Sequence, residues 1–252
     1  MVSTTPKRAQ PAPPASSTVE NYLKQLFRQQ RANGNGMVSM GSLAAAMGVA
    51  PGTATSMAKS LAESGLARYA PRTGVRLSPA GEQLALHVIR RHRLVELFLV
   101  KVLQLDWSVV DDEAERLEHA ISDRVLERMD ALLDFPTADP HGDPIPSAGG
   151  RLHEPRRLSL ANCPLGAPQR IARVLDQDPN FLQFVERVEL VPGAVVTVVS
   201  RLIAAGAVQL QRARREPISL GLPAAGSILV EPRQVAGNTS RSQPRRERKN
   251  LS

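Results

Sequence analysis

The sequence predicts a mainly α-helical protein that ends in a small all-β domain. Apolar residues recur at helical spacing through much of residues 18–133. Between residues 169 and 231, by contrast, short apolar runs alternate with Pro and Gly, which is typical of short strands. Only 3% of the residues are aromatic, so the core must consist mostly of Leu, Val, Ile and Ala, a composition that suits helices.

The first helical elements have the spacing of a helix-turn-helix motif with a wing. A helix is expected over Thr18–Gln30, with Thr18 as its N-cap, followed by a short helix over Met40–Met47 and, after a turn, a helix over Gly52–Ser64. In this layout the last helix lies in a major groove of DNA. Residues 66–70 and 75–77 flank a basic turn as two short strands, which predicts the wing.

Two helices longer than a typical globular helix follow, over Ser78–Leu105 and Ser108–Leu133. Residues 135–168 are rich in Pro and Gly. Beyond them we expect a helix at Phe181–Glu186 and strands at Val188–Val191, Val195–Val199, Ala207–Leu210 and Ile228–Val230. Short strands of this kind predict a small β-barrel.

Composition and charge exclude several classes of protein. No apolar run approaches the ~20 residues that cross a bilayer, and the chain begins without a hydrophobic signal segment, so we expect a cytoplasmic protein with no membrane partner. The single cysteine, Cys163, excludes an internal disulfide framework. The net charge of +8 is concentrated in the tails, with +5 after residue 231 and +2 from Lys7 and Arg8. Bulk charge therefore does not identify a DNA-binding protein.

A cluster of acidic and imidazole side chains marks the two long helices. Its members are His92 and Glu96 on the first helix and Asp111, Glu115, Glu118 and His119 on the second. The spacing within each helix puts its members on one face. Such groups on facing stripes would repel one another unless they were protonated, paired or bridged, and a divalent cation is the simplest solution. Nearby arginines could instead pair the carboxylates across the helix surface.

No enzymatic motif accompanies this cluster. The string from Glu115 to His119 has Glu where an inverted zinc-protease motif requires His, and the chain has no H-E-x-x-H sequence. No pair of Glu-x-x-His motifs supports a di-iron site, and no nucleophile–base pair or nucleotide-binding loop is apparent. We therefore expect a binding protein and not an enzyme.

Four strings resemble those of the diphtheria-toxin-repressor family of metal-dependent regulators, in particular its manganese-responsive members. They are TVENYL at residues 18–23, RHRLVE at 91–96, DEAERLEHAISD at 112–123 and PHGDPIP at 140–146. The resemblance covers about residues 18–147, and the C-terminal region is similar in pattern to the SH3-like domain that such repressors often carry. It implies a homodimer that binds palindromic, double-stranded operator DNA when Mn(II) or Fe(II) is plentiful and thereby represses metal-uptake genes.

The same resemblance assigns metal-binding positions. It places ligands at His92, Glu96, Glu118 and His119. Glu115 occupies the position whose donor differs between iron-responsive and manganese-responsive members, and its hard carboxylate oxygen favours Mn(II) where a thiolate would favour softer metals. Asp111 stands where a family histidine helps to form an ancillary site.

Several positions depart from the family pattern or stay open. Asn21 replaces the Met or Asp that usually supplies a ligand from the first helix, and its neutral amide oxygen donates less charge to a cation. Lys24 stands where manganese regulators can carry a second carboxylate, which argues against a two-manganese centre. Whether Gln177 and Asn180 in the barrel contribute ligands is left open.

Residues of the third helix and the wing are the expected DNA contacts, through polar side chains and, at Gly52, through close approach of the backbone. They are Gly52, Thr53, Thr55, Ser56 and Lys59 on the helix and Arg72 and Arg76 on the wing. A metal that joins Asn21 to the long helices would fix the angle of the third helix and the wing, which together are called the reading head. The alternative is a repressor that answers a small organic effector in the barrel, with the acidic face as a salt-bridged surface.

These expectations divide the chain into six segments. They are a disordered tail (1–16), the winged helix-turn-helix domain (17–77), the helical metal-binding and dimerisation domain (78–147), a Pro/Gly-rich linker (148–168), the SH3-like β-barrel (169–231) and a basic disordered tail (232–252). The basic tail would attract DNA phosphates without reading bases.

Overall fold

A computed structural model describes residues 16–213 and 215–233, so the two predicted tails lie almost entirely outside the described residues. The described chain forms two compact units. Unit 1 contains the residues up to 156 together with 177–184, and unit 2 contains 157–176 and the residues from 185 on. No helix of the described residues is long and apolar enough to cross a membrane.

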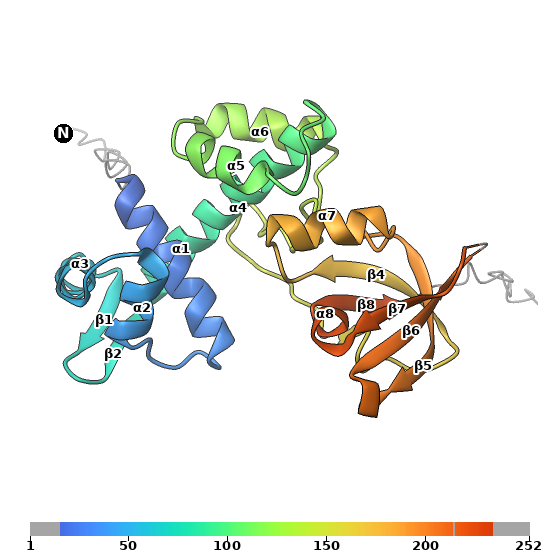
Figure 1. Ribbon diagram of the computed structural model, residues 1–252. Helices are drawn as coiled ribbons and strands as arrows, with labels where there is room; N and C mark the ends of the chain where they lie inside the picture. The colour runs from blue at the N-terminus through green and yellow to red at the C-terminus, as the bar shows by residue number, and fades with distance from the viewer. Residues whose placement is uncertain (1–15, 214, 234–252) are drawn as a thin grey trace, which may run out of the picture. The chain divides into compact units, whose positions relative to one another are not determined.

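Unit 1 begins with the predicted winged helix-turn-helix. Its elements are α1 (Ser17–Ala32), α2 (Met40–Met47), α3 (Pro51–Glu63), β1 (Ala67–Ala70) and β2 (Gly74–Leu77), drawn in blue to cyan in Figure 1. Ser16, not the predicted Thr18, is the N-cap of α1, because its side chain accepts a hydrogen bond from the backbone N–H of Val19. A common core, which includes the fully buried Leu26 and Leu43, joins the elements.

Close backbone contacts hold the wing against the helices, and two of them require glycine. β1 and β2 pair antiparallel, and Val75 also exchanges backbone hydrogen bonds of 2.8 and 2.9 Å with Val38. At Gly74, φ is +136°, and an added Cβ would lie 2.2 Å from the Val38 carbonyl oxygen. A Cβ at Gly81 would lie 1.9 Å from the Leu66 oxygen, so the helix that follows packs directly on the chain beside the wing.

One long helix and two short ones complete the helical part of unit 1. α4 (Pro79–Lys101) begins at the N-cap Ser78 with proline in its first turn. The predicted single helix over Ser108–Leu133 is wrong, because the chain forms α5 (Val110–Glu118) and α6 (Asp123–Leu132) instead. Ser122 interrupts it with extended backbone, φ −71° and ψ 153°, and its side chain caps α6 by accepting from the Val125 N–H.

Packing on α4 positions both α5 and the loop after α6. Val95 and Leu99 of α4 form a buried cluster with Val110 and Ala114 of α5. Leu94 and Leu97 form another buried cluster with Ile145, which lies in the loop that follows α6. Polar residues of α5 and of this loop are thereby brought to the same helix, α4.

Unit 2 contains the predicted small β domain, with a six-stranded antiparallel sheet. Its strands are β3 (Leu158–Ser159), β4 (Pro168–Val174), β5 (Val195–Leu202), β6 (Ala207–Arg212), β7 (Ile218–Gly221) and β8 (Ile228–Pro232), in the order β3-β8-β4-β5-β6-β7. Bulges interrupt the pairing of β4 with β8 and of β5 with β6. α8 (Leu222–Gly226) precedes β8.

Of one helix and one strand predicted in this region, the helix is confirmed and the strand is wrong. The helix predicted at Phe181–Glu186 is confirmed as α7 (Pro179–Arg187), which spans the division between the units. The strand predicted at Val188–Val191 is wrong. These residues follow the end of α7 in a turn, where Glu189 has a left-handed φ of 55° that a strand cannot contain.

Candidate metal centre

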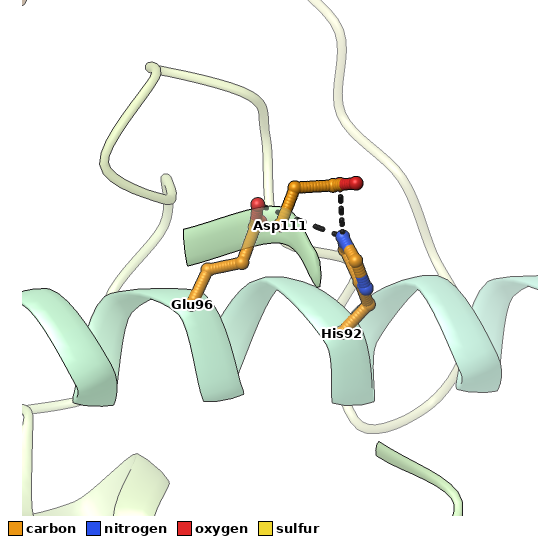
Figure 2. A group of neighbouring side chains, drawn as sticks. All are labelled: His92, Glu96 and Asp111. Carbon is orange, nitrogen blue, oxygen red and sulfur yellow. Dashed lines mark hydrogen bonds and ion pairs between the residues drawn. The ribbon is translucent and has the colours of Figure 1, made fainter. Parts of the chain in front are cut away.

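Side chains from α4 and α5 converge at the predicted cluster. His92 and Glu96 extend from one face of α4, and Asp111 reaches them from the first turn of α5, as Figure 2 shows. The His92 Nε2 atom lies 3.1 Å from Asp111 Oδ1 and 3.5 Å from Glu96 Oε1. We call these three residues the outer group, because a ligand atom of each lies within 4.8 Å of the others and Asp111 is exposed.

The other nitrogen of His92 joins the outer group to the C-terminal end of α5. His92 Nδ1 lies 2.6 Å from Glu118 Oε2 and 3.5 Å from Glu115 Oε2. Burial lowers the pKa of His92, but hydrogen bonds to Asp111, Glu118 and Glu96 raise it well above its usual value. The hydrogen bond from His92 holds the pKa of Asp111 at about 2. A positive charge is therefore strongly favoured at this point of the fold.

Lys24 of α1 supplies a second positive charge to the same carboxylates. Its buried ammonium donates to Glu118 Oε1 over 2.9 Å and also contacts the Glu115 carboxylate. Burial raises the pKa of Glu118, but the hydrogen bond from His92 and the nearby charges of His92 and Lys24 lower it overall. The lysine thus lies where the resemblance placed a metal between these two carboxylates.

His119 connects the end of α5 to α1. Its Nδ1 lies 2.6 Å from Glu20 Oε2, and its Nε2 lies 3.0 Å from Asn21 Oδ1 and 3.3 Å from Glu118 Oε1. The structure therefore brings all seven predicted metal residues into one network of contacts, although the helix containing four of them ends at Glu118. Glu20 was not predicted, and its position next to Asn21 in the sequence is the signal that could have indicated it.

A further group, which sequence reasoning missed, lies on the other side of Glu96. Asp139 and His141 from the loop after α6 place ligand atoms within 4.8 Å of Glu96 and of each other. We call Glu96, Asp139 and His141 the inner group, since all three are buried. His141 belongs to the PHGDPIP string, but nothing in the linear sequence shows that this string faces Glu96.

The two residues left open in the β region have other contacts. Gln177 donates a side-chain hydrogen bond of 3.0 Å to Asp143 Oδ2, and both residues belong to unit 1. The backbone N–H of Asn180 donates to Asp178 Oδ1 over 3.0 Å in the first turn of α7.

The predicted DNA-contacting residues lie on the surface of the winged helix. On α3, Gly52, Thr53, Ser56 and Lys59 are exposed and Thr55 is half-buried, while Arg72 and Arg76 are exposed on the wing. The Thr55 hydroxyl donates to the Pro51 carbonyl oxygen over 2.8 Å. The buried face of α3, with Ala54, Ala58 and Leu61, turns toward the core and leaves the polar face outward.

The donor atoms of the network suit a divalent cation. The outer group offers an imidazole and two carboxylates, a set that suits first-row divalent ions such as Mn(II) and Fe(II). The outer group can therefore hold such an ion, which would replace the proton on His92 Nε2. Glu115 and Glu118 fit one as well, but only where the Lys24 ammonium withdraws.

A winged helix joined to a cluster of imidazole and carboxylate ligands defines a DNA-binding regulator with a candidate metal centre. Comparison with family models agrees with this class. Residues 15–75 match the N-terminal DNA-binding domain of iron-dependent repressors, and residues 78–147 match their metal-binding and dimerisation domain. Residues 158–232 match the FeoA domain.

Individual proteins extend the comparison. An uncharacterised HTH-type transcriptional regulator of Methanocaldococcus jannaschii is 33% identical over 119 residues, which cover 47% of this chain and 94% of the relative. The iron-dependent repressor IdeR of Mycobacterium leprae is 33% identical over 146 residues, which cover 53% of this chain and 64% of IdeR. A solved structure, of a manganese-dependent transcriptional repressor in complex with manganese, is 38% identical with a TM-score of 0.74 and covers 85% of this chain and 99% of that one.

The chain belongs to the iron-dependent repressor family. The characterised relatives among these are metal-dependent transcriptional repressors and not enzymes. A further structural neighbour, ScaR with bound Cd²⁺, is 32% identical with a TM-score of 0.70 and covers 85% of this chain and 99% of that one.

Proposed function

We propose that this chain represses metal-uptake genes by binding palindromic operator DNA as a homodimer in response to Mn(II), with Fe(II) as the alternative ion. The observation that carries the proposal is the network that joins α1 of the DNA-binding part to α4 and α5. His119 contacts Asn21 and Glu20 of α1, while Glu118, its neighbour in the sequence, contacts His92 of α4. A change in this network is transmitted directly to the helix that leads into the reading head.

The ion would be held by residues already gathered in the network. They are His92, Glu96 and Asp111, together with Glu115, Glu118, His119 and the amide oxygen of Asn21. A bound cation would supply the positive charge that keeps these carboxylates together. Manganese is supported by the preponderance of hard oxygen donors and by a manganese-dependent structural neighbour, and iron by the iron-dependent relatives.

The remaining surfaces suit a dimer that reads DNA. The polar face of α3 and the wing arginines would contact base edges and phosphates, with Arg72 and Arg76 placed for the backbone or the minor groove. α6 has no buried residue within the described chain, and Val125, Leu132 and Phe135 leave apolar surface exposed on it and just beyond it. This surface belongs to the segment that matches a dimerisation domain, so we assign it to the partner subunit.

Operator binding by the full chain tests this function. Duplexes would be selected from a random-sequence pool in the presence of Mn(II), and affinity would then be titrated in chelator and in Mn(II), Fe(II) or Zn(II), anaerobically for Fe(II). We expect Mn(II) to tighten binding by about 5- to 150-fold, the usual range of coupling between sites. Equal affinity with and without every metal would contradict the proposal and favour an organic effector.

Two variants test the centre itself in the same assay. His119→Ala removes the contact with α1, so Mn(II) should no longer tighten operator binding although the circular dichroism of the fold is retained. Glu115→Cys replaces an oxygen donor with a thiolate, which should raise the response to Fe(II), Co(II) or Zn(II) relative to Mn(II). A parental response in His119→Ala would refute the site, and a parental metal order in Glu115→Cys would refute the argument for manganese.

A further inference from the structure

Lys24 is a buried cation on α1 to which the proposed function gives no role. The residue is only 4% exposed, and its ammonium donates to Glu118 Oε1 over 2.9 Å and contacts the Glu115 carboxylate. Because Glu118 is fully buried, water screens this contact poorly. A charge is stable at such a depth only when it is paired, so the ammonium is confined to these two carboxylates.

The Lys24 contact connects three helices through one carboxylate. Glu118 Oε1 accepts from Lys24 of α1, and Glu118 Oε2 lies 2.6 Å from His92 Nδ1 of α4. Glu118 itself is the last residue of α5. α1 is therefore fastened to α4 and α5 by a cation that belongs to the chain.

The ammonium and a metal ion cannot share this position. An ion held by the same carboxylate oxygens of Glu115 and Glu118 would lie about 2.0–2.6 Å from each of them, within the space that the hydrogen atoms of the ammonium take up. The two positive charges would also repel each other where water screens them poorly. Lys24 thus excludes an ion from these two carboxylates while it remains between them.

The outer group remains open to an ion. The ion pairs of Lys24 within the described chain go to Glu115 and Glu118 and not to a residue of the outer group. The outer group meets at His92 Nε2, whereas His92 contacts Glu118 through Nδ1. An ion can therefore enter the outer group and leave the contacts of the lysine in place.

We propose that Lys24 is a built-in substitute for a metal ion, which docks α1 on α5 in the metal-free chain and thereby preserves part of the affinity for operator DNA. α1 leads into the reading head, so a contact that fixes α1 also favours the DNA-binding arrangement. An ion in the outer group then adds to an arrangement that is already partly formed, which makes the response to metal graded. The consequence for DNA rests on the proposed function, whereas the docking of α1 by Lys24 does not.

Hydrogen exchange of the full chain, measured without DNA, tests the docking directly. In chelator, the backbone amides of α1 in the parent should already be protected, and Mn(II) should slow their exchange by less than about tenfold. In Lys24→Met, which is similar in length but uncharged, their exchange in chelator should be at least about tenfold faster than in the parent. If the α1 amides of the parent become protected only when Mn(II) is added, the proposal is overturned, even where operator binding is observed.

Operator binding separates this role from a purely structural one. In chelator, Lys24→Met should bind the selected duplex about tenfold more weakly than the parent, whereas in saturating Mn(II) the two affinities should agree within about threefold. A lysine that only stabilises the fold would lower the affinity equally in both conditions. That result would contradict the proposal without contradicting the proposed function.

Metal content gives an independent measurement. Lys24→Glu replaces the ammonium with a third carboxylate, so the position between Glu115 and Glu118 becomes available to an ion. After loading with Mn(II) and gel filtration, Lys24→Glu should hold about one ion more per chain than the parent, as measured by elemental mass spectrometry. Lys101→Glu, a charge reversal at an exposed position, is the matched control. Equal ion content in folded Lys24→Glu and the parent would overturn the proposal, and where a variant does not fold, the exchange of α1 in the parent decides.

Discussion

At the scale of single residues, the charge on His92 connects the metal centre to stability. Both ring nitrogens face carboxylates, so the metal-free protein holds an additional proton there. The folded-state pKa is raised above the unfolded value of about 6.5, so the stabilising contribution is complete below about pH 6.5 and is lost as the pH rises through the raised value. A metal ligand must be unprotonated at the coordinating atom. The affinity for the metal should therefore increase as the pH rises.

The proton on His92 should make the stability of the metal-free protein depend on pH. In chelator, the stability of the parent should fall with rising pH above about 6.5 more steeply than that of His92→Gln, which cannot hold the proton. Thermal unfolding between pH 6 and 9 measures the difference, with the exposed His87→Gln as control. A gap between parent and His92→Gln that does not vary with pH would contradict the assignment.

Lys24 gives a second prediction at this scale. Lys24→Gln removes the ammonium partner of the fully buried Glu118 but leaves its hydrogen bond with His92, so the metal-free protein should lose about 1–3 kcal/mol of stability. The same change removes a competing cation from Glu115 and Glu118, so Mn(II) should bind at least about tenfold more tightly, a gain of about 1.4 kcal/mol.

Calorimetric titration with Mn(II) and chemical denaturation in chelator measure these two effects. Lys101→Gln, at an exposed position at the end of α4, is the matched control. Unchanged or weaker Mn(II) binding by Lys24→Gln would show that the lysine does not compete with the ion.

At the scale of elements, helical spacing predicted which side chains share a face but not where a helix stops. Asp111, Glu115 and Glu118 were correctly placed on one face, whereas the break after Glu118 depends on a single side-chain cap at Ser122. An isolated serine is a weak signal, because serine is also tolerated within helices. The edge strand β3, only two residues long, has too few residues to show any alternation.

The reading head gives a prediction at the same scale. Lys59 on α3 and Arg76 on β2 are exposed side chains from two elements of one surface. Replacing either by Ala should weaken operator binding for all sequences and reduce the slope of log affinity against log salt by about 1, because one phosphate contact is lost. Gel-shift titrations from low to high salt measure the slope, with Lys101→Ala as control. If both variants keep the slope of the parent, neither Lys59 nor Arg76 contacts a phosphate, which would contradict the assignment of this surface to DNA.

At the scale of the whole molecule, the sequence predicted the fold class because its signals are local. The winged helix, the helical part and the strand-rich part each have their own periodicity, as α1, α4 and β5 illustrate. The pairing of Lys24 with Glu118, and of Glu96 with His141, joins residues far apart in the chain. Such contacts depend on how α1 and the loop after α6 pack on α4, which no local pattern specifies.

In the proposed function, the metal centre and the DNA-reading surface are coupled through the network at α1. Coupling of this kind is reciprocal, so DNA must raise the affinity for the ion by the same factor by which the ion raises the affinity for DNA. Calorimetric titration of Mn(II) into the full chain, with and without the selected duplex, measures this directly. We predict that the duplex tightens Mn(II) binding about 5- to 150-fold and that His119→Ala abolishes the effect. Identical Mn(II) affinity in the presence and absence of the duplex would contradict the account.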